Sequence, residues 1–177
     1  MRMVYKILII TIPIIFYIVY KISTPNSELN KMTNEEIKTY FIKHNRELKY
    51  LVGICDKYPQ IKFVDTTDID ILLDYYNKKL SNDTREKIKQ MQSMIKKLKI
   101  YSMSCGSGIG NDDNQLAGVD FTLYSSGLSL GGEAESISFE TKAFRDLFKH
   151  KKRIKVDGIK VYPLNEEGWS IVVSQSK

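Results

Sequence analysis

An apolar segment near the N-terminus, Ile7 to Tyr20, constrains this chain more than any other feature. Its fourteen residues carry no charged side chain. When the segment is counted from Met3, with Lys6 reaching toward the headgroups, it meets the lower limit of roughly 17 residues for a spanning helix. We therefore predict a transmembrane anchor over residues 1–23, with the lipid bilayer as its partner.

A basic start before a short apolar stretch is also typical of a cleaved signal peptide. Cleavage requires small residues after the apolar stretch, and Tyr17 to Ile22 contains none. Arg2 and Lys6 precede the segment, which favours a cytoplasmic N-terminus. We expect a single-pass protein of the cytoplasmic (inner) membrane, with its C-terminal domain in the periplasm or outside the cell.

The rest of the chain predicts one domain. Residues 24–32 are polar and are expected to form a tether, while residues 33–177 suffice for a single extracytoplasmic domain. Without the three basic residues of the anchor, the net charge falls from +6 to +3. A balance of this size does not indicate a nucleic-acid partner.

The first half of this domain has the apolar spacing of helices. Thr33 and Glu36 match a capping box, which predicts a helix ending near Pro59. A second helix is expected between Ile69 and Leu80. A third should begin at a cap formed by Asp83 and Glu86, with an apolar stripe of Ile88, Met91, Ile95 and Leu98.

In the second half, the apolar period changes from 3.6 to 2, which indicates strands. They are expected over residues 100–105 and 119–124, near 137–139, and as a hairpin over 159–162 and 169–173. A short strand at 61–64 and a short helix at 141–150 complete the set. The order predicts an α+β fold, with two to three helices packed on an antiparallel sheet of four to six strands.

One catalytic pattern occurs, Gly127 to Gly131 around Ser129, followed by Asp146 and His150 in the order of a serine hydrolase. The pattern has meaning only on a tight turn between a parallel strand and a helix. The residues after it favour another strand, so we expect a glycine-containing turn. A membrane-associated hydrolase using Ser129 stays an alternative.

Other candidate sites lack part of their pattern. Gly106 to Gly110 has no Gly-Lys-Ser/Thr for a phosphate and is expected to be a connector. Asn111 to Asn114 lacks the spacing of a calcium loop. The pairs Cys105 with His150 and Cys55 with His44 have no activating neighbour, and their spacing does not suit zinc. We therefore predict no catalytic, cofactor-binding or metal-binding residue, and no cofactor.

Cys55 and Cys105 could form a disulfide in an oxidising compartment, or both could be buried free thiols; the sequence leaves this open. The densest charge is a basic run, which we take as a candidate interaction patch: Lys149, Lys151, Lys152, Arg153 and Lys155. It could meet an acidic partner or anionic headgroups. It could equally be a solvated helix end and an edge strand protected by lysines.

Two phrases in the C-terminal half carry a resemblance. The stretch Gly118 to Gly132 and the stretch Val161 to Val173, with its Tyr-Pro-Leu and Gly-Trp pairs, resemble small membrane-anchored periplasmic proteins of Gram-negative bacteria. Some of these look like immunity proteins against interbacterial toxins. This chain departs from them after Trp169, where Ser170, Ile171 and Val172 stand in place of the usual tyrosines. The resemblance transfers no site residue.

The expected function is therefore that of a membrane-tethered periplasmic binding protein, without catalysis, with an unidentified protein partner. Neutralisation of a periplasm-acting toxin is its most specific form. A structural or adaptor component of an envelope assembly is the alternative.

Overall fold

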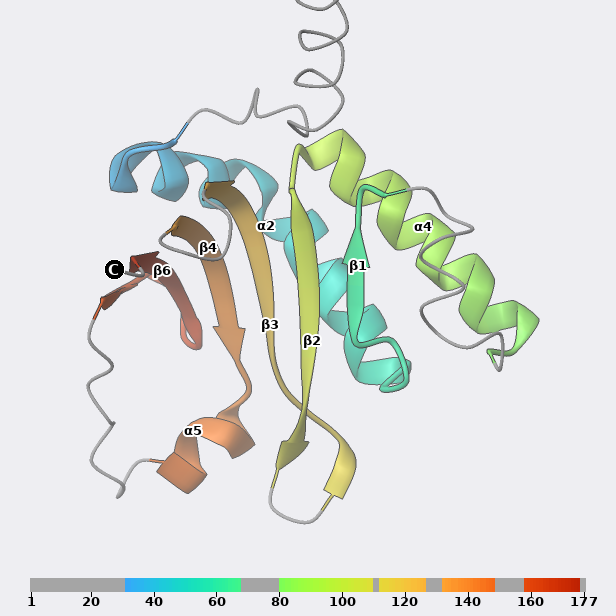
Figure 1. The fold of residues 1–177 in the computed structure, drawn as a ribbon. Helices are drawn as coiled ribbons and strands as arrows, with labels where there is room; N and C mark the ends of the chain where they lie inside the picture. The colour runs from blue at the N-terminus through green and yellow to red at the C-terminus, as the bar shows by residue number, and fades with distance from the viewer. Residues whose placement is uncertain (1–30, 68–79, 110–111, 127–131, 149–157, 176–177) are drawn as a thin grey trace, which may run out of the picture. The chain divides into compact units, whose positions relative to one another are not determined.

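The computed structural model describes residues 31–67, 80–109, 112–126, 132–148 and 158–175. This part of the chain forms three helices and one six-stranded sheet (Figure 1), which confirms the α+β class. The helices are α2 (Asn34–Lys57), α4 (Asn82–Leu98) and α5 (Lys142–Phe148). The strands are β1 (Phe63–Asp65), β2 (Ser102–Ile109), β3 (Asp112–Ser126), β4 (Glu133–Glu140), β5 (Ile159–Pro163) and β6 (Trp169–Gln175).

The sheet is antiparallel throughout, in the order β1-β2-β3-β4-β6-β5. One row of paired residues crosses all six strands on its inner face: Val64, Met103, Phe121, Ile137, Ile171 and Tyr162. The first five side chains are fully buried, whereas Tyr162 on β5 is 36% exposed. The core therefore ends at β6, and β5 lies at its margin.

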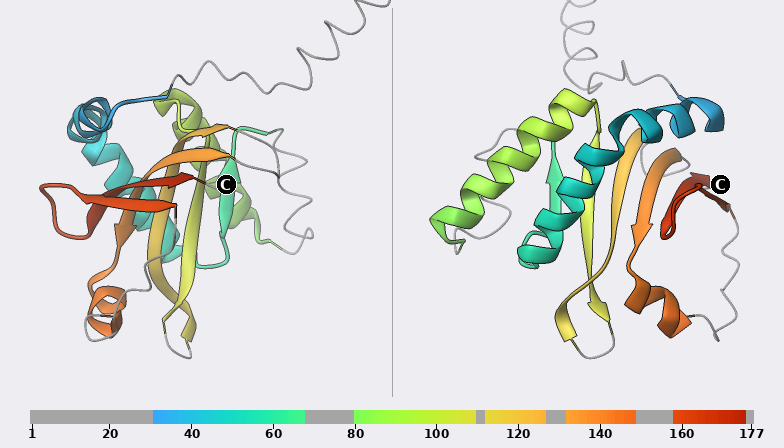
Figure 2. Two further views of the ribbon diagram at one scale, coloured as in Figure 1. Left: turned by 60° about the vertical axis from the view of Figure 1, so that its left-hand side comes forward. Right: turned by 180° about the vertical axis from the view of Figure 1, so that it is seen from behind.

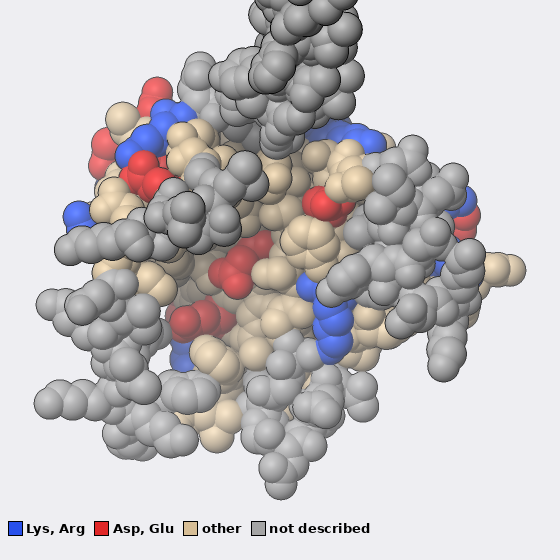
Figure 3. Space-filling model, viewed as in Figure 1, with Lys and Arg blue, Asp and Glu red and all other residues tan. Residues whose placement is uncertain are grey.

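α2 and α4 both pack on this inner face, as the view from behind shows (Figure 2). The outer face carries a different row: Phe63, Ser104, Asp120, Ser138, Ser170 and Pro163. No described helix covers this face, and acidic side chains lie near its middle (Figure 3). Along β2, β4 and β6, apolar side chains of the inner face thus alternate with serines of the outer face, which separates core from surface.

α2 begins as the sequence predicts. The Thr33 hydroxyl accepts from the Glu36 backbone N–H at 3.3 Å, and the Glu36 carboxylate accepts from the Thr33 N–H at 2.7 Å. The helix ends at Lys57, one residue before its cap at Tyr58. Two orphan backbone donors are satisfied at its start, which fixes where the helix begins.

The predicted cap of α4 was wrong. Ser81, two residues before Asp83, is the N-cap and accepts from the Thr84 N–H at 3.2 Å. Asp83 instead accepts from the Tyr58 hydroxyl at 2.8 Å and so ties α4 to the end of α2. The predicted apolar stripe of α4 is buried as expected.

Several strands are longer than the sequence pattern predicts. β3 spans Asp112–Ser126, and β2 continues through Gly106 to Ile109, so most of the expected connector is strand. Register shifts after Gly106, after Ser107 and between Thr122 and Tyr124 interrupt the alternation there. A bulge reverses the faces of the following residues, so a strict period of 2 cannot detect the whole strand.

The predicted tether ended at residue 32, yet its last two residues contact the sheet. Lys31 forms an ion pair with Glu133 at 2.6 Å. The Met32 N–H donates to the Glu135 carboxylate at 3.0 Å, and Glu135 is only 3% exposed. β4 therefore holds the chain just before α2 begins.

Within the described ranges, no helix is long and apolar enough to cross a membrane. The predicted anchor, residues 1–23, and the predicted helix between Ile69 and Leu80 lie outside the described residues.

Candidate protein-binding site

A half-open cleft lies between α2 and the turn that joins β5 to β6. Its volume is about 500 Å³. It is lined by Lys38, Phe41, Ile42, Asn45, Pro163, Leu164, Asn165 and Glu166. We call it the α2 cleft. Its size falls in the range of pockets that hold one ligand or one anchoring side chain.

Trp169 joins the hairpin to α2 beside this cleft. Its ring lies 5.1 Å from the Phe41 ring and 5.0 Å from the Phe139 ring, and it is 4% exposed. Phe121 stacks on it at 6.1 Å. Such aromatic pairs add to the free energy of burial, so one wall of the cleft is rigidly placed.

The turn itself is fixed from both sides. Gly168 adopts a φ of 85°, and its carbonyl accepts from the Glu140 N–H at 2.8 Å. Glu166 accepts from the Asn45 amide at 2.8 Å and pairs with Lys49 at 2.5 Å. Lys49, and then Asn45, hold the pKa of Glu166 below its usual value. These contacts bind the rim of the cleft to α2.

Ile42 is an exposed apolar side chain of the cleft, and other exposed apolar side chains lie on β5, the strand before the turn. Ile42, on α2, is 75% exposed and lines the cleft directly. On β5, Ile159, Val161 and Tyr162 are 43%, 47% and 36% exposed. Scattered exposed apolar residues need no explanation, but an exposed apolar side chain in the lining of a cleft is typical of an interaction site.

β5 forms one edge of the sheet, and no described strand pairs with its outer side. The Gln175 N–H donates to the Gly158 carbonyl at 2.7 Å, and the Leu164 N–H donates to the Trp169 carbonyl at 3.0 Å. Because antiparallel strands alternate, the even-numbered residues of β5 face β6. The backbone groups of Ile159, Val161 and Pro163 therefore point outward.

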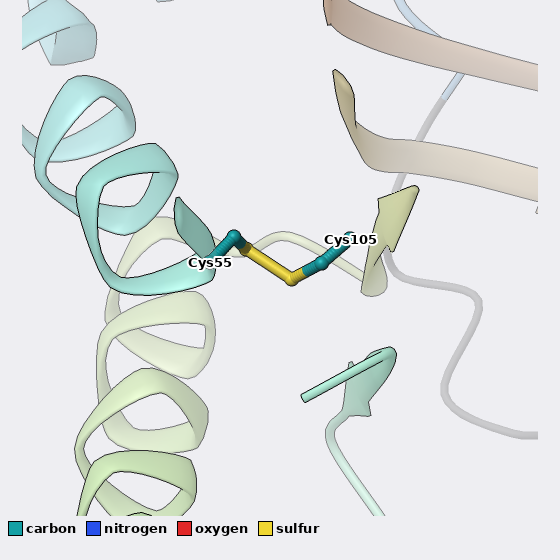
Figure 4. Close-up of a disulfide and its surroundings, with 2 residues drawn as sticks. All are labelled: Cys55 and Cys105. Carbon is teal, nitrogen blue, oxygen red and sulfur yellow. A yellow bond between two sulfur atoms is a disulfide. The ribbon is translucent and has the colours of Figure 1, made fainter. Parts of the chain in front are cut away.

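Cys55 of α2 and Cys105 of β2 form a disulfide across the core (Figure 4), with an S–S distance of 2.11 Å. Both side chains are buried. A disulfide sulfur is no thiolate, so neither the pair of Cys55 with His44 nor that of Cys105 with His150 can act as a nucleophile and base in this state.

Most of the other candidate residues lie outside the part of the chain that the structure describes. Ser129, His150 and the basic patch from Lys149 to Lys155 lie outside the described residues, while Asp146 is exposed on α5. In the described part of the chain, no three His, Cys, Asp or Glu residues gather as metal ligands would.

Sequence reasoning missed the α2 cleft. One signal was available: Ile42 lies off the apolar stripe formed by Ile37, Phe41 and Leu48 of the same helix. No sequence pattern indicated that Leu164 and Glu166 line the cleft, because their position there depends on the hairpin lying against α2.

Comparison with known proteins adds nothing to this geometry: no family model, curated protein or solved structure matches the chain.

Proposed function

We propose that this protein is a membrane-tethered, extracytoplasmic binding module that holds a protein partner at the α2 cleft. The observation that carries the proposal is the exposure of Ile42 in a preformed cleft that is lined by both apolar and polar side chains. Complete burial of an isoleucine side chain contributes about 1.5–3 kcal/mol, which is the size of an interface hot spot.

Two features support the extracytoplasmic placement. The apolar segment from Ile7 to Tyr20 is suited to an anchor, and the arginine and lysine before it favour export of the domain on its C-terminal side. The disulfide between Cys55 and Cys105 suits an oxidising compartment, because cytosolic thiols are generally kept reduced.

Toxin neutralisation is the specific form of this function that we propose. The resemblance to periplasmic immunity proteins favours it, and the tether offers a physical advantage. A binder confined to the membrane has a high local concentration where an incoming toxin would act. It needs no catalytic group, only a surface that covers the working surface of the toxin.

The placement can be tested with reporters fused after Lys177. Alkaline phosphatase, which folds only outside the cytoplasm, should be active, and green fluorescent protein fused at the same site should be dark. The full chain should also stay with the membrane after carbonate extraction. A bright cytosolic fluorescent fusion with inactive phosphatase would contradict the proposal.

Binding can be tested with the product of the neighbouring gene. We expect the wild-type chain to protect cells from that product and to co-purify with it, and Ile42→Asp to lose both. Tyr101→Asp is the matched control, since Tyr101 is 39% exposed and does not line the cleft. Equal protection by both variants would contradict the role of the cleft. Recovery of resident envelope proteins alone would favour an adaptor instead.

A further inference from the structure

The outer edge of β5 is a candidate for a second binding surface, which has only Pro163 in common with the lining of the α2 cleft. Its outward backbone groups are the N–H groups of Ile159 and Val161 and the carbonyls of Ile159, Val161 and Pro163. The five side chains from Ile159 to Pro163 are all exposed. Among the described residues, no strand pairs with these outward donors and acceptors, and such an edge is a template for another strand.

We propose that this edge pairs with the β5 edge of a second copy of the chain. The two strands would run antiparallel about a two-fold axis at Val161 and join the two sheets into one. A two-fold contact of this kind requires one surface to be complementary to itself. The sequence of β5 meets that requirement in one register.

In that register, Val161 lies opposite Val161 of the second copy, and Ile159 lies opposite Pro163. The two Val161 residues exchange two hydrogen bonds. Each Ile159 N–H donates to a Pro163 carbonyl and adds one more at each end. Proline has no N–H, so the only groups left without a partner are the Ile159 carbonyls, at the ends of the contact.

The side chains agree with the same register. Val161 meets Val161 and Ile159 meets Pro163 on one face, and Lys160 meets Tyr162 on the other. The lysine stem and ammonium can lie against the tyrosine ring. No like charges are directly opposed, which matters because such pairs destabilise a sheet.

Neighbouring registers fit less well. A shift that centres the axis on Lys160 places two lysines directly opposite one another. A shift that centres it on Tyr162 places Val161 opposite Pro163, where the missing proline N–H leaves one bond of each central pair unmade. Self-complementarity in a single register favours a second copy over an unrelated strand.

The contact is small, because only five residues pair on each side. We therefore expect weak self-association in solution, strengthened where both copies are confined to one membrane. That confinement belongs to the proposed function, whereas the register does not depend on it.

Cysteine cross-linking in the full chain tests the register. Val161→Cys should give a covalent dimer with a short bismaleimide or a mild oxidant in the cell fraction that contains the protein. Ile159→Cys alone should give far less covalent dimer. The double variant Ile159→Cys with Pro163→Cys should form the dimer again, because these two positions lie opposite one another. Ile42→Cys is the control for random collision, because Ile42 is 75% exposed and lies on α2.

A second measurement does not depend on cross-linking. Val161→Lys places two positive charges at the axis and should weaken self-association roughly fivefold or more, as measured by the mass distribution of the purified full chain. Val161→Thr keeps the branched shape of the side chain and should leave self-association nearly unchanged. Because Val161 is 47% exposed, we expect both variants to fold like the wild type, and circular dichroism of the purified chains checks this.

The proposal is overturned if Val161→Cys and Ile42→Cys cross-link equally, or if Val161→Lys associates as well as Val161→Thr. Membrane extraction of the same samples reports separately on the anchor. A dimer found in a soluble fraction would therefore support the edge pairing while contradicting the tether.

Discussion

Two glycines show how the surroundings of one backbone position decide whether a larger side chain can be accommodated there. Gly118 lies in β3 opposite Glu140, and a β-carbon there would collide with the carbonyl oxygen of Phe139. Gly53 lies exposed on α2, and a β-carbon there would meet nothing within 4 Å. The first glycine permits close strand pairing, and the second has no such role.

We predict opposite effects from the same substitution at these positions. Gly118→Ala should lower the free energy of unfolding by about 1–3 kcal/mol, because β3 and β4 must move apart. Gly53→Ala should raise it by about 0.5–1 kcal/mol, since glycine costs conformational entropy in a helix. Urea unfolding of the purified chain measures both. Equal changes would mean that strand spacing near Gly118 is adjustable.

The buried carboxyl of Glu135 should make stability depend on pH. Burial raises its pKa above the ordinary 4.5, although the Met32 N–H partly opposes this. The folded state therefore binds the proton more tightly than the unfolded state does. As the pH rises from the ordinary pKa through the raised one, the free energy of unfolding should fall. Glu135→Gln should remove this dependence in melting temperatures measured across the range.

Glu166 serves as the control with the opposite sign. Lys49 lowers its pKa, so its contribution is present above the ordinary value and is lost as the pH falls through the lowered pKa. Glu166→Gln should therefore reduce acid sensitivity. If Glu135→Gln and Glu166→Gln changed the pH dependence of stability in the same direction, the opposite pKa shifts assigned to the two carboxyls would be wrong.

At the scale of single elements, local capping decides where helices begin. Ser81 caps α4 through the Thr84 N–H, while Glu86 forms an exposed ion pair with Lys89 at 3.1 Å. Ser81→Ala should cost about 1 kcal/mol, as the loss of an N-cap usually does. Glu86→Ala should stay within about 0.5 kcal/mol, because exposed ion pairs contribute little. Thermal unfolding compares the two variants. A larger loss of stability for Glu86→Ala than for Ser81→Ala would favour the cap of Asp83 and Glu86 that the sequence predicted.

At the scale of the whole molecule, the disulfide links α2 to β2, the second strand of the sheet. The bonded cysteines are 50 residues apart in sequence. The double variant Cys55→Ser with Cys105→Ser should lose about 3–4 kcal/mol, because the unfolded chain regains the entropy of an open loop. Denaturant unfolding with and without a reductant measures this. A wild-type midpoint insensitive to full reduction would contradict it.

The elements differ in how far the sequence predicted them. The start of α2 at Thr33 and the hairpin through Gly168 were predicted, because capping and turn chemistry act within a few residues. The α4 cap was misplaced by two residues, since Asp83 has the same capping chemistry as Ser81. The ends of β2 and β3 were missed because bulges shift the register there.

By itself, the sequence determined the α+β class, the start of α2 and the closing hairpin, because these depend on local periodicity and turn residues. Only the tertiary structure decided that Cys55 meets Cys105, that Ile42 lies beside the β5–β6 turn, and that β5 is an edge. These features depend on which distant strands pair and on which face α2 packs. Strand order is set by the free energy of the whole core, which no single segment encodes.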